Sequence, residues 1–259
     1  MSTSKAATEQ KRGTLRSVKR LSGFTIFAKD GDIGIAHELL FDDDTWAIKY
    51  LVVHTGPIIA GRKVLIAPEA FSYLVPKAEQ FHLKLTREQV SNSPTIEADK
   101  PVSLQHQREV HHYFGWPWIF MGSRSAIPAP LPETEEREKQ LTEQTEERDP
   151  HLRSSKGIIN SYDIEAADGK LGHVEDFLVD DASWIIRYMV VDTRDWLPGK
   201  KALVATQWIA HIDFERARVH VDLLKEKIKN SPEYDPLKTV DRDYEELIHN
   251  HYGRRGYWW

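Results

Sequence analysis

The chain contains one stretch of sequence twice. A shift of 138 positions places residues 26–94 on residues 164–232 without a gap. The match includes the glycine-containing segments at 30–34 and 168–172. Each copy is too long to be one turn of a solenoid and long enough to be a small domain with its own core. The sequence therefore predicts a duplicated domain, whose function must be explained by two similar but diverged modules.

Short apolar segments alternate with turn residues in each copy. In the second copy, an alternating segment at 174–180 is followed by an Asp-Asp turn and by the apolar run 184–191, which corresponds to 46–53 in the first copy. Segments 202–205 and 218–223 resemble two further strands. Short strands at close, regular spacing favour a small antiparallel barrel or sandwich.

Helical sequence follows the strands of each copy. Thr86, with Gln89 three residues later, matches a capping box at the start of a short helix. Ser103 and Asp241 are suited to cap a second helix at matched positions, and each of these helices has a glycine just past its expected end. We therefore expect a helical extension after each set of strands.

Composition changes sharply between the two copies. Residues 133–149 are almost wholly charged or polar, and such a segment cannot bury enough apolar surface to offset its ordering entropy. We expect a flexible basic N-terminus at 1–20, a first module with its extension at 21–121, an acidic proline-containing linker at 122–155 and a second module at 156–259.

Charge and cysteine content exclude several classes of protein. There are 35 Lys and Arg against 40 Asp and Glu, and the net charge of −5 disfavours strong binding along nucleic acid. The absence of cysteine excludes disulfides and thiolate metal sites. The sequence has no apolar run long enough to span a membrane and no apolar signal segment near its start. We expect a cytoplasmic protein.

The repeated motif resembles the PRC-barrel family. It consists of Asp-Gly-x-x-Gly, a strand, the Asp-Asp turn and Trp-x-Ile-Arg/Lys-Tyr-x-Val-Val, and the segment 192–204 strengthens the match in the second copy. The first copy departs from it in the loop 54–61, which has no tryptophan where Trp196 stands. The family includes the cytoplasmic domain of the photosynthetic reaction-centre H subunit and the C-terminal domain of a ribosome maturation factor.

This resemblance implies two small six-stranded antiparallel β-barrels, each with a C-terminal helical extension. The family shares no set of catalytic residues, so the resemblance implies a barrel that binds a protein partner and assigns no catalytic residue, cofactor or metal. It leaves the partner unnamed, and the sequence leaves a homodimer open.

Two groups of side chains are candidate metal ligands. Asp42, Asp43 and Asp44, with Asp180 and Asp181, offer oxygen ligands for a hard cation, but Asp between two strands more often closes a turn on its own backbone. Histidines end the second helix of each copy, at 111–112 and at 249 and 251. Neither spacing places both rings on one face of a helix, so we expect structural roles and no metal site.

Aromatic residues outside the expected strands and helices are the candidates for an interface. Trp and Tyr are enriched at binding hot spots, and both copies end in aromatic clusters. At the end of the second copy we favour packing within the chain over a role in an interface. The candidate interface residues are Trp116, Trp118, Trp196, Tyr257, Trp258 and Trp259.

The sequence favours a noncatalytic protein–protein adaptor or assembly module. The Gly-x-Ser-x-Gly, P-loop and Gly-x-Gly-x-x-Gly motifs are all missing from it. The first alternative is an RNA-associated or ribosome-associated assembly factor, by analogy with one branch of the family. The second alternative is an enzyme with a site between the barrels, which is motivated by the His and Asp clusters alone.

Overall fold

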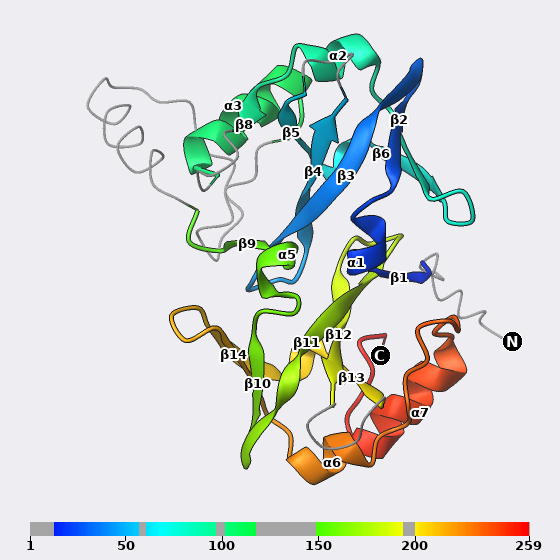
Figure 1. The fold of residues 1–259 in the computed structure, drawn as a ribbon, viewed down its shortest axis with the longest axis vertical. Coiled ribbons are helices and arrows are strands. Elements are labelled where there is room, and N and C mark those ends of the chain that lie inside the picture. The colour runs from blue at the N-terminus through cyan, green and yellow to red at the C-terminus, as the bar shows by residue number, and fades with distance from the viewer. Residues whose placement is uncertain (1–12, 57–60, 97–101, 118–148, 194–199, 259) are drawn as a thin grey trace, which may run out of the picture. The chain divides into compact units, whose positions relative to one another are not determined.

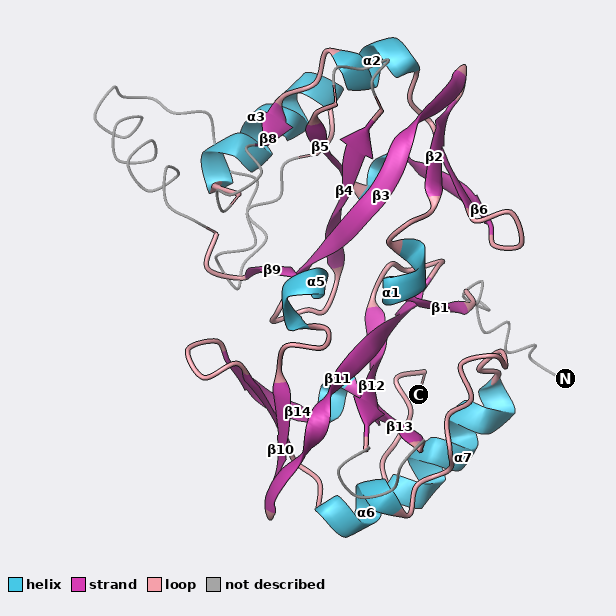
Figure 2. Ribbon diagram, viewed as in Figure 1, coloured by secondary structure: helices cyan, strands magenta, loops and turns pink. Residues whose placement is uncertain are grey.

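The part of the chain that the structure describes is mainly β and forms two sheets (Figures 1 and 2). The computed structural model describes residues 13–56, 61–96, 102–117, 149–193 and 200–258. No helix in these ranges is both long and apolar enough to cross a membrane.

The chain divides into two compact units that do not follow the order of the sequence. The first-copy unit consists of residues 21–44 and 48–154. The second-copy unit consists of residues 1–20, 45–47 and 155–259. The second-copy unit therefore includes two segments from the first half of the chain, 1–20 and 45–47, and the first-copy unit extends beyond its own copy to residue 154.

The sheet of the first-copy unit has the order β6-β7-β2-β3-β4-β5-β8, and β9 pairs with β3. Helices α2 and α3 follow the strands, and the 3-10 turn η2 joins β5 to β6. The elements are β2 (Thr25–Ala28), β3 (Gly31–Asp42), β4 (Ile48–Thr55), β5 (Lys63–Ile66), η2 (Pro68–Ala70), β6 (Phe71–Val75), β7 (Gln80–Leu83), α2 (Arg87–Ser91), β8 (Thr95–Ile96), α3 (Leu104–Phe114) and β9 (Leu152–Ser154).

The sheet of the second-copy unit has the order β13-β12-β11-β10-β15-β14, and β1 pairs with β11. Its elements are β1 (Leu15–Ser17), α5 (Ser155–Ile158), β10 (Asp163–Ala166), β11 (Gly169–Asp180), β12 (Ile186–Asp192), β13 (Lys201–Ala205), η3 (Thr206–Trp208), β14 (Ile209–Asp213), β15 (Arg218–Val221), α6 (Lys225–Lys229) and α7 (Arg242–Tyr252). Helix α1 (Val18–Leu21) follows β1 and leads into the first copy.

The expectation of fully antiparallel sheets is wrong for one strand pair in each unit. β2 and β7 are parallel, and so are β10 and β15. The other pairings of both sheets are antiparallel, which requires β13 and β14 to run in the same direction. The reason is that η3 redirects the chain between them without reversing it, as η2 does between β5 and β6. Among the described residues, neither strand order closes on itself, so the expected closed barrels are not established.

The segment expected to be a flexible basic N-terminus contains a strand. Residues 15–17, with the sequence Leu-Arg-Ser, form β1 and pair with β11 in the second-copy unit. Part of the expected linker also forms a strand. Residues 152–154 repeat Leu-Arg-Ser as β9, which pairs with β3 in the first-copy unit. Each unit thus takes the strand that precedes the other copy in the sequence.

The expected helices and caps are confirmed. Thr86 and Gln89 form both hydrogen bonds of the capping box at α2. Ser103 caps α3 through a hydrogen bond from the backbone of His106, and Asp241 caps α7 in the same way. The glycine after each of the two long helices adopts a left-handed conformation, which ends the helix at the expected place.

Helix and strand residues share one core in the first-copy unit. Tyr50, Val52 and Leu65 from the sheet pack with Val110 of α3, and Leu152 of β9 belongs to the same buried cluster. The strand taken from outside the copy therefore contributes apolar surface to the core as well as backbone pairing.

The two tryptophans expected to open strands lie in turns instead. Trp46 and Trp184 have φ of 60° and 54°, a left-handed conformation that a bulky residue adopts only under constraint. In the second-copy unit, the backbone oxygen of Trp46 accepts a hydrogen bond from Ile186 at 2.8 Å, and its ring lies 5.9 Å from that of Phe177. These contacts fix a turn of the first copy inside the second-copy unit.

Candidate functional site

A face of the first-copy sheet with few charged groups is the strongest candidate for a binding surface. Along β2 and β7, buried residues alternate with half-buried residues that point away from the core. Residues that face each other on paired strands lie on the same side of the sheet. Two rows of side chains therefore cross β3, β2, β7 and β6 on this outer side, and they are Ile35, Thr25, Gln80 and Val75 in one row and Asp32, Phe27, His82 and Tyr73 in the other.

Three rings of the second row stack on one another. The ring of His82 lies 5.1 Å from that of Phe27 and 4.3 Å from that of Tyr73, with interplanar angles of 17° and 11°. Tyr73 is 57% exposed and Ile35 is 54% exposed. These side chains give the outer side of the sheet, which we call the aromatic face, a row of three stacked rings with exposed apolar groups at Tyr73 and Ile35.

The matched face of the second-copy unit is charged. The corresponding rows are His173, Asp163, Arg218 and Asp213, then Lys170, Glu165, His220 and His211. Lys170 lies 2.9 Å from Asp163, and Arg218 lies 3.5 Å from Glu165. The aromatic face has Asp32 as its formally charged member, so the two copies of one fold present chemically different surfaces at the same place.

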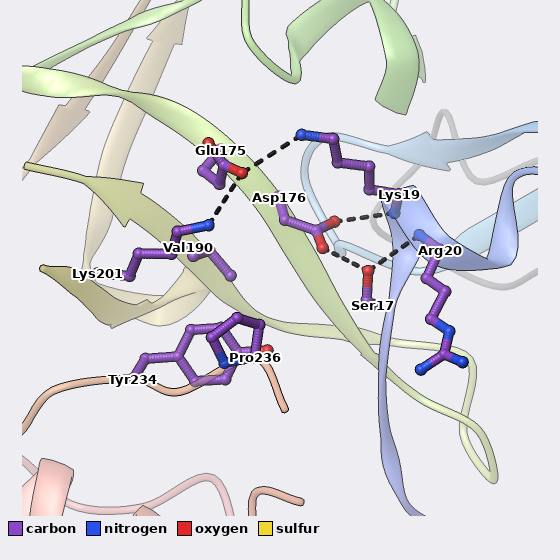
Figure 3. A pocket seen from close by; sticks show the side chains of 9 residues that line it. All are labelled: Ser17, Lys19, Arg20, Glu175, Asp176, Val190, Lys201, Tyr234 and Pro236. Atoms are coloured by element: carbon purple, nitrogen blue, oxygen red, sulfur yellow. Dashed lines mark hydrogen bonds and ion pairs between the residues drawn. The ribbon is translucent and has the colours of Figure 1, made fainter. Parts of the chain in front are cut away.

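A pocket of about 260 Å³ in the second-copy unit lies beside β1 (Figure 3). The carboxylate of Asp176 in its wall accepts hydrogen bonds from Ser17 Oγ at 2.5 Å and from the backbone of Lys19 at 2.9 Å. The neighbouring Glu175 pairs with Lys201 at 3.1 Å and with Lys19 at 3.3 Å. The charged groups of this pocket thus hold the N-terminal segment on β11.

Burial and neighbouring cations shift the pKa values of these two carboxyl groups in opposite directions. Burial raises the pKa of Asp176, although hydrogen bonds from Ser17, Lys19 and Phe177 oppose it. Burial also pushes the pKa of Glu175 upward, but hydrogen bonds and positive charge from Lys201 and Lys19 outweigh it and leave this pKa below its usual value. Asp176 is accordingly the more easily protonated member of the pair.

The Asp-Asp turns bind β1 and β9, the strands that the two units take from outside their own copies and that we call the exchanged strands. The carboxylate of Asp180 accepts hydrogen bonds from the backbone of residues 182 and 183, as a turn residue does. Asp181 binds the Arg16 side chain at 2.8 Å, and in the other unit Asp43 binds the Arg153 side chain at 2.6 Å. The turns therefore act as structural anchors.

Two clusters of described residues bring together groups able to ligate a metal ion. They are Asp43, Asp44 and His151, and His173, Glu175 and Asp192, and within each cluster the ligand atoms lie within 4.8 Å of one another. Asp43 is also paired with an arginine, and Glu175 is also paired with two lysines. Those cations compete directly with a metal for the carboxylates.

The histidines at the helix ends point to separate partners. His111 Nε2 lies 3.0 Å from the hydroxyl of Tyr50, and His249 Nε2 lies 3.0 Å from that of Tyr188. His251 instead contacts the backbone oxygen of Lys227 at 2.7 Å. The expected structural role fits this arrangement.

The aromatic residues proposed for an interface are partly placed by the structure. Trp116 stacks on Phe114 at 4.2 Å. The Tyr257 hydroxyl donates a hydrogen bond of 2.7 Å to the buried Glu245, and Trp258 lies 3.8 Å below the guanidinium of Arg242. Tyr257 and Trp258 thus pack on their own unit. The remaining three candidates, Trp118, Trp196 and Trp259, lie outside the described residues.

The aromatic face was not found from the sequence. In the sequence, His82 and His220 occupy matched positions of an alternating segment, and this pattern by itself indicates a structural role. The chemical difference between the two faces depends on residues from four strands, and these residues come together only through the strand order. No protein-family model matches the chain, and a comparison with curated proteins finds no match.

Proposed function

We propose that this chain is a noncatalytic, cytoplasmic tandem PRC-barrel protein that acts as a protein–protein adaptor, with the aromatic face as its binding surface. The observation that carries the proposal is the contrast between the two copies. The matched face in the second-copy unit bears the charged pairs of an ordinary solvated surface, whereas the first copy exposes Tyr73 and Ile35 there. Exposed apolar patches of this kind mark interaction sites.

The strand connections support the barrel part of the proposal. In the second-copy unit, β13 and β14 stand at opposite ends of the strand order, yet only the three residues of η3 join them in the chain. Such a short connection requires the two ends of the sheet to approach each other, so the sheet must curl strongly. In the first-copy unit η2 joins β5 to β6 in the same way, with β6 at one end of the strand order and β5 next to β8 at the other end.

The face favours a protein partner over RNA. Binding to nucleic acid requires Lys or Arg side chains that meet phosphates, and the two rows of the aromatic face contain neither. Stacked rings next to Thr25 and Gln80 instead provide apolar contact area with neutral hydrogen-bonding groups, as at the centre of a protein interface. The RNA-associated function remains the second candidate, motivated by the family resemblance.

The test compares matched substitutions in the two copies. Tyr73→Ser with Ile35→Ser removes the exposed apolar groups of the aromatic face, and His211→Ser changes the position in the second copy that matches Tyr73. Because these side chains are exposed, each variant should stay folded, as circular dichroism would check. Tagged wild-type chain and the His211→Ser variant should capture the same proteins from native extract, and the Tyr73→Ser/Ile35→Ser variant should lose them.

Equal capture by all the chains would refute the proposal for this face. Capture of RNA that disappears at raised salt and survives the double substitution would favour the assembly-factor alternative.

A further inference from the structure

The two exchanged strands, β1 and β9, are bound in the same way. We call each of them the donor strand of the unit in which it lies, and the residues that bind it the acceptor site. β1 pairs with Leu178, Val179 and Asp180, and β9 pairs with Leu40, Phe41 and Asp42, which are the same three positions of the repeat. Both strands have the sequence Leu-Arg-Ser. The backbone register and the donor sequence are therefore identical in the two units.

The side-chain contacts are also repeated. The arginine of each donor strand binds the second aspartate of the turn, Arg16 with Asp181 and Arg153 with Asp43. The serine of each donor binds a carboxylate at matched positions of the long strand, Ser17 with Asp176 and Ser154 with Glu38. Each unit thus contains an acceptor site that recognises an extended segment through one cation and one hydroxyl group.

The acceptor sites require the donor. Asp176 is 8% exposed, so the second-copy unit without β1 would leave this carboxylate without its hydroxyl partner Ser17. Leu152 is 8% exposed and belongs to β9, so the first-copy unit without β9 would lose an apolar residue from its core. A buried carboxylate without its partner is unfavourable, and so is apolar core surface that is left uncovered. An empty acceptor site would therefore bind any available strand of the same chemistry.

We infer that each unit carries a strand-acceptor site for a Leu-Arg-Ser segment, and that a second copy of the chain can fill it, which gives a strand-exchanged dimer. A donor from another molecule offers the same residues in the same register as the donor from the same molecule. The two arrangements differ in connectivity and not in contacts, which is the condition under which exchange between molecules costs little. This inference is independent of the aromatic face.

Two full-length variants test it by complementation. Arg16→Glu places a carboxylate opposite Asp181, and Asp181→Arg places two guanidinium groups opposite each other in the other variant. Each variant alone carries a repelling donor–acceptor pair in the second-copy unit. In a mixture, the donor and acceptor of one variant match the acceptor and donor of the other, so both pairs become attractive between two molecules.

Native mass spectrometry of the mixture should show a heterodimer at twice the 29.9 kDa of one chain. The chain that carries both substitutions, R16E and D181R, is the control. Its own donor and acceptor are complementary again, so it should be monomeric and should not join either single variant. Separate monomers in a mixture of two folded single variants would overturn the inference.

A failure of the single variants to fold leaves the test intact. The two denatured variants are then refolded together, and folding is followed by circular dichroism. Recovery of a folded heterodimer from the mixture alone supports the inference. No recovery, while the double variant folds under the same conditions, overturns it.

Discussion

The phenol oxygen of Tyr188 lies 3.0 Å from Nε2 of His249, and the phenol oxygen of Tyr50 lies 3.0 Å from Nε2 of His111. In each unit this pair ties a central strand to the long helix at its end. The third member of the network differs between the copies. It is the carboxyl group of Glu245 in the second-copy unit and the amide of Gln107 in the first, both hydrogen-bonded to the tyrosine.

Glu245→Gln gives the second-copy unit the network of the first. Glu245 is 0% exposed and accepts hydrogen bonds from Tyr188 and Tyr257, and Arg242 lies 3.1 Å from its other oxygen. The amide would leave Arg242 without its charged partner, so we expect the free energy of unfolding to fall by about 1–3 kcal/mol. Urea unfolding measures this free energy. The Gln107→Ala variant, which removes the amide partner of Tyr50 and leaves His111 in place, is the comparison in the other unit.

An unchanged unfolding free energy in the Glu245→Gln variant would contradict this account. It would mean that the contribution of Arg242 to the free energy of unfolding comes from its stacking over Trp258, at 3.8 Å, and not from its pairing with Glu245.

Stability should fall as the solution becomes acidic through the histidine of this network. Burial lowers the pKa of His249, although hydrogen bonds with the backbone of Arg255 and Arg254 oppose this. Below the unfolded-state pKa of about 6.5, the unfolded chain binds a proton that the folded chain holds less readily, so folding is disfavoured. The loss should begin as pH falls through that value.

Urea unfolding at a series of pH values from 8 to 5 measures the effect. The His249→Gln variant should show a shallower decline than the wild-type chain, because it lacks the titrating group. The opposite sign is expected for His151, whose pKa is raised by its hydrogen bond to Asp43. Its contribution is fully present below about 6.5 and is lost as pH rises through the folded-state pKa. A steeper decline in the His249→Gln variant would refute the assignment.

Much of the local structure could be predicted from the sequence, because it depends on neighbouring residues. Capping at Thr86, Ser103 and Asp241, and the glycine that ends each long helix, follow from short-range hydrogen bonding. The β class follows from the alternation of apolar and polar residues along the short segments. The parallel strand pair could not be predicted, since it depends on whether a three-residue 3-10 turn reverses the chain.

The exchange of β1 and β9 could not be predicted for a different reason. Both segments read Leu-Arg-Ser, so pairing within a copy and pairing between copies satisfy the same residues, and local sequence does not distinguish them. The candidate site could not be predicted for a related reason. Tyr73, His82 and Phe27 lie on three strands, and their stacking appears only after the strand order is known.

The terminal aromatic residues should stabilise the second-copy unit. The Tyr257 ring lies 4.2 Å from the guanidinium of Arg187, and its hydroxyl binds the buried Glu245. The Trp258 ring lies 4.9 Å from that of His249. Burying one large aromatic side chain contributes about 1.5–3 kcal/mol. Deletion of residues 257–259 should therefore lower the melting temperature and increase the binding of a hydrophobic dye.

Differential scanning fluorimetry and dye titration measure both effects, and the Leu237→Ser variant serves as a control, because Leu237 is 94% exposed. Unchanged stability together with loss of partner capture would instead assign these aromatic residues to an interface.

If the chain is cut between the two copies, the two fragments should remain bound to each other. A protease recognition sequence inserted at residue 135, which lies outside the described residues, allows the cut. The N-terminal fragment then carries β1, which belongs to the second-copy unit, and the C-terminal fragment carries β9, which belongs to the first-copy unit. Separation of the fragments would remove Leu152 from its core cluster and Ser17 from Asp176. We expect the cut protein to elute from size-exclusion chromatography as a single one-to-one complex that separates only in denaturant.

The control is the same cut in the Arg16→Glu/Arg153→Glu chain. Each substitution replaces an arginine that binds an aspartate with a carboxylate that repels it, so the fragments should separate at a lower urea concentration. Two separate folded fragments after cutting the wild-type chain would show that neither unit needs the other copy's strand.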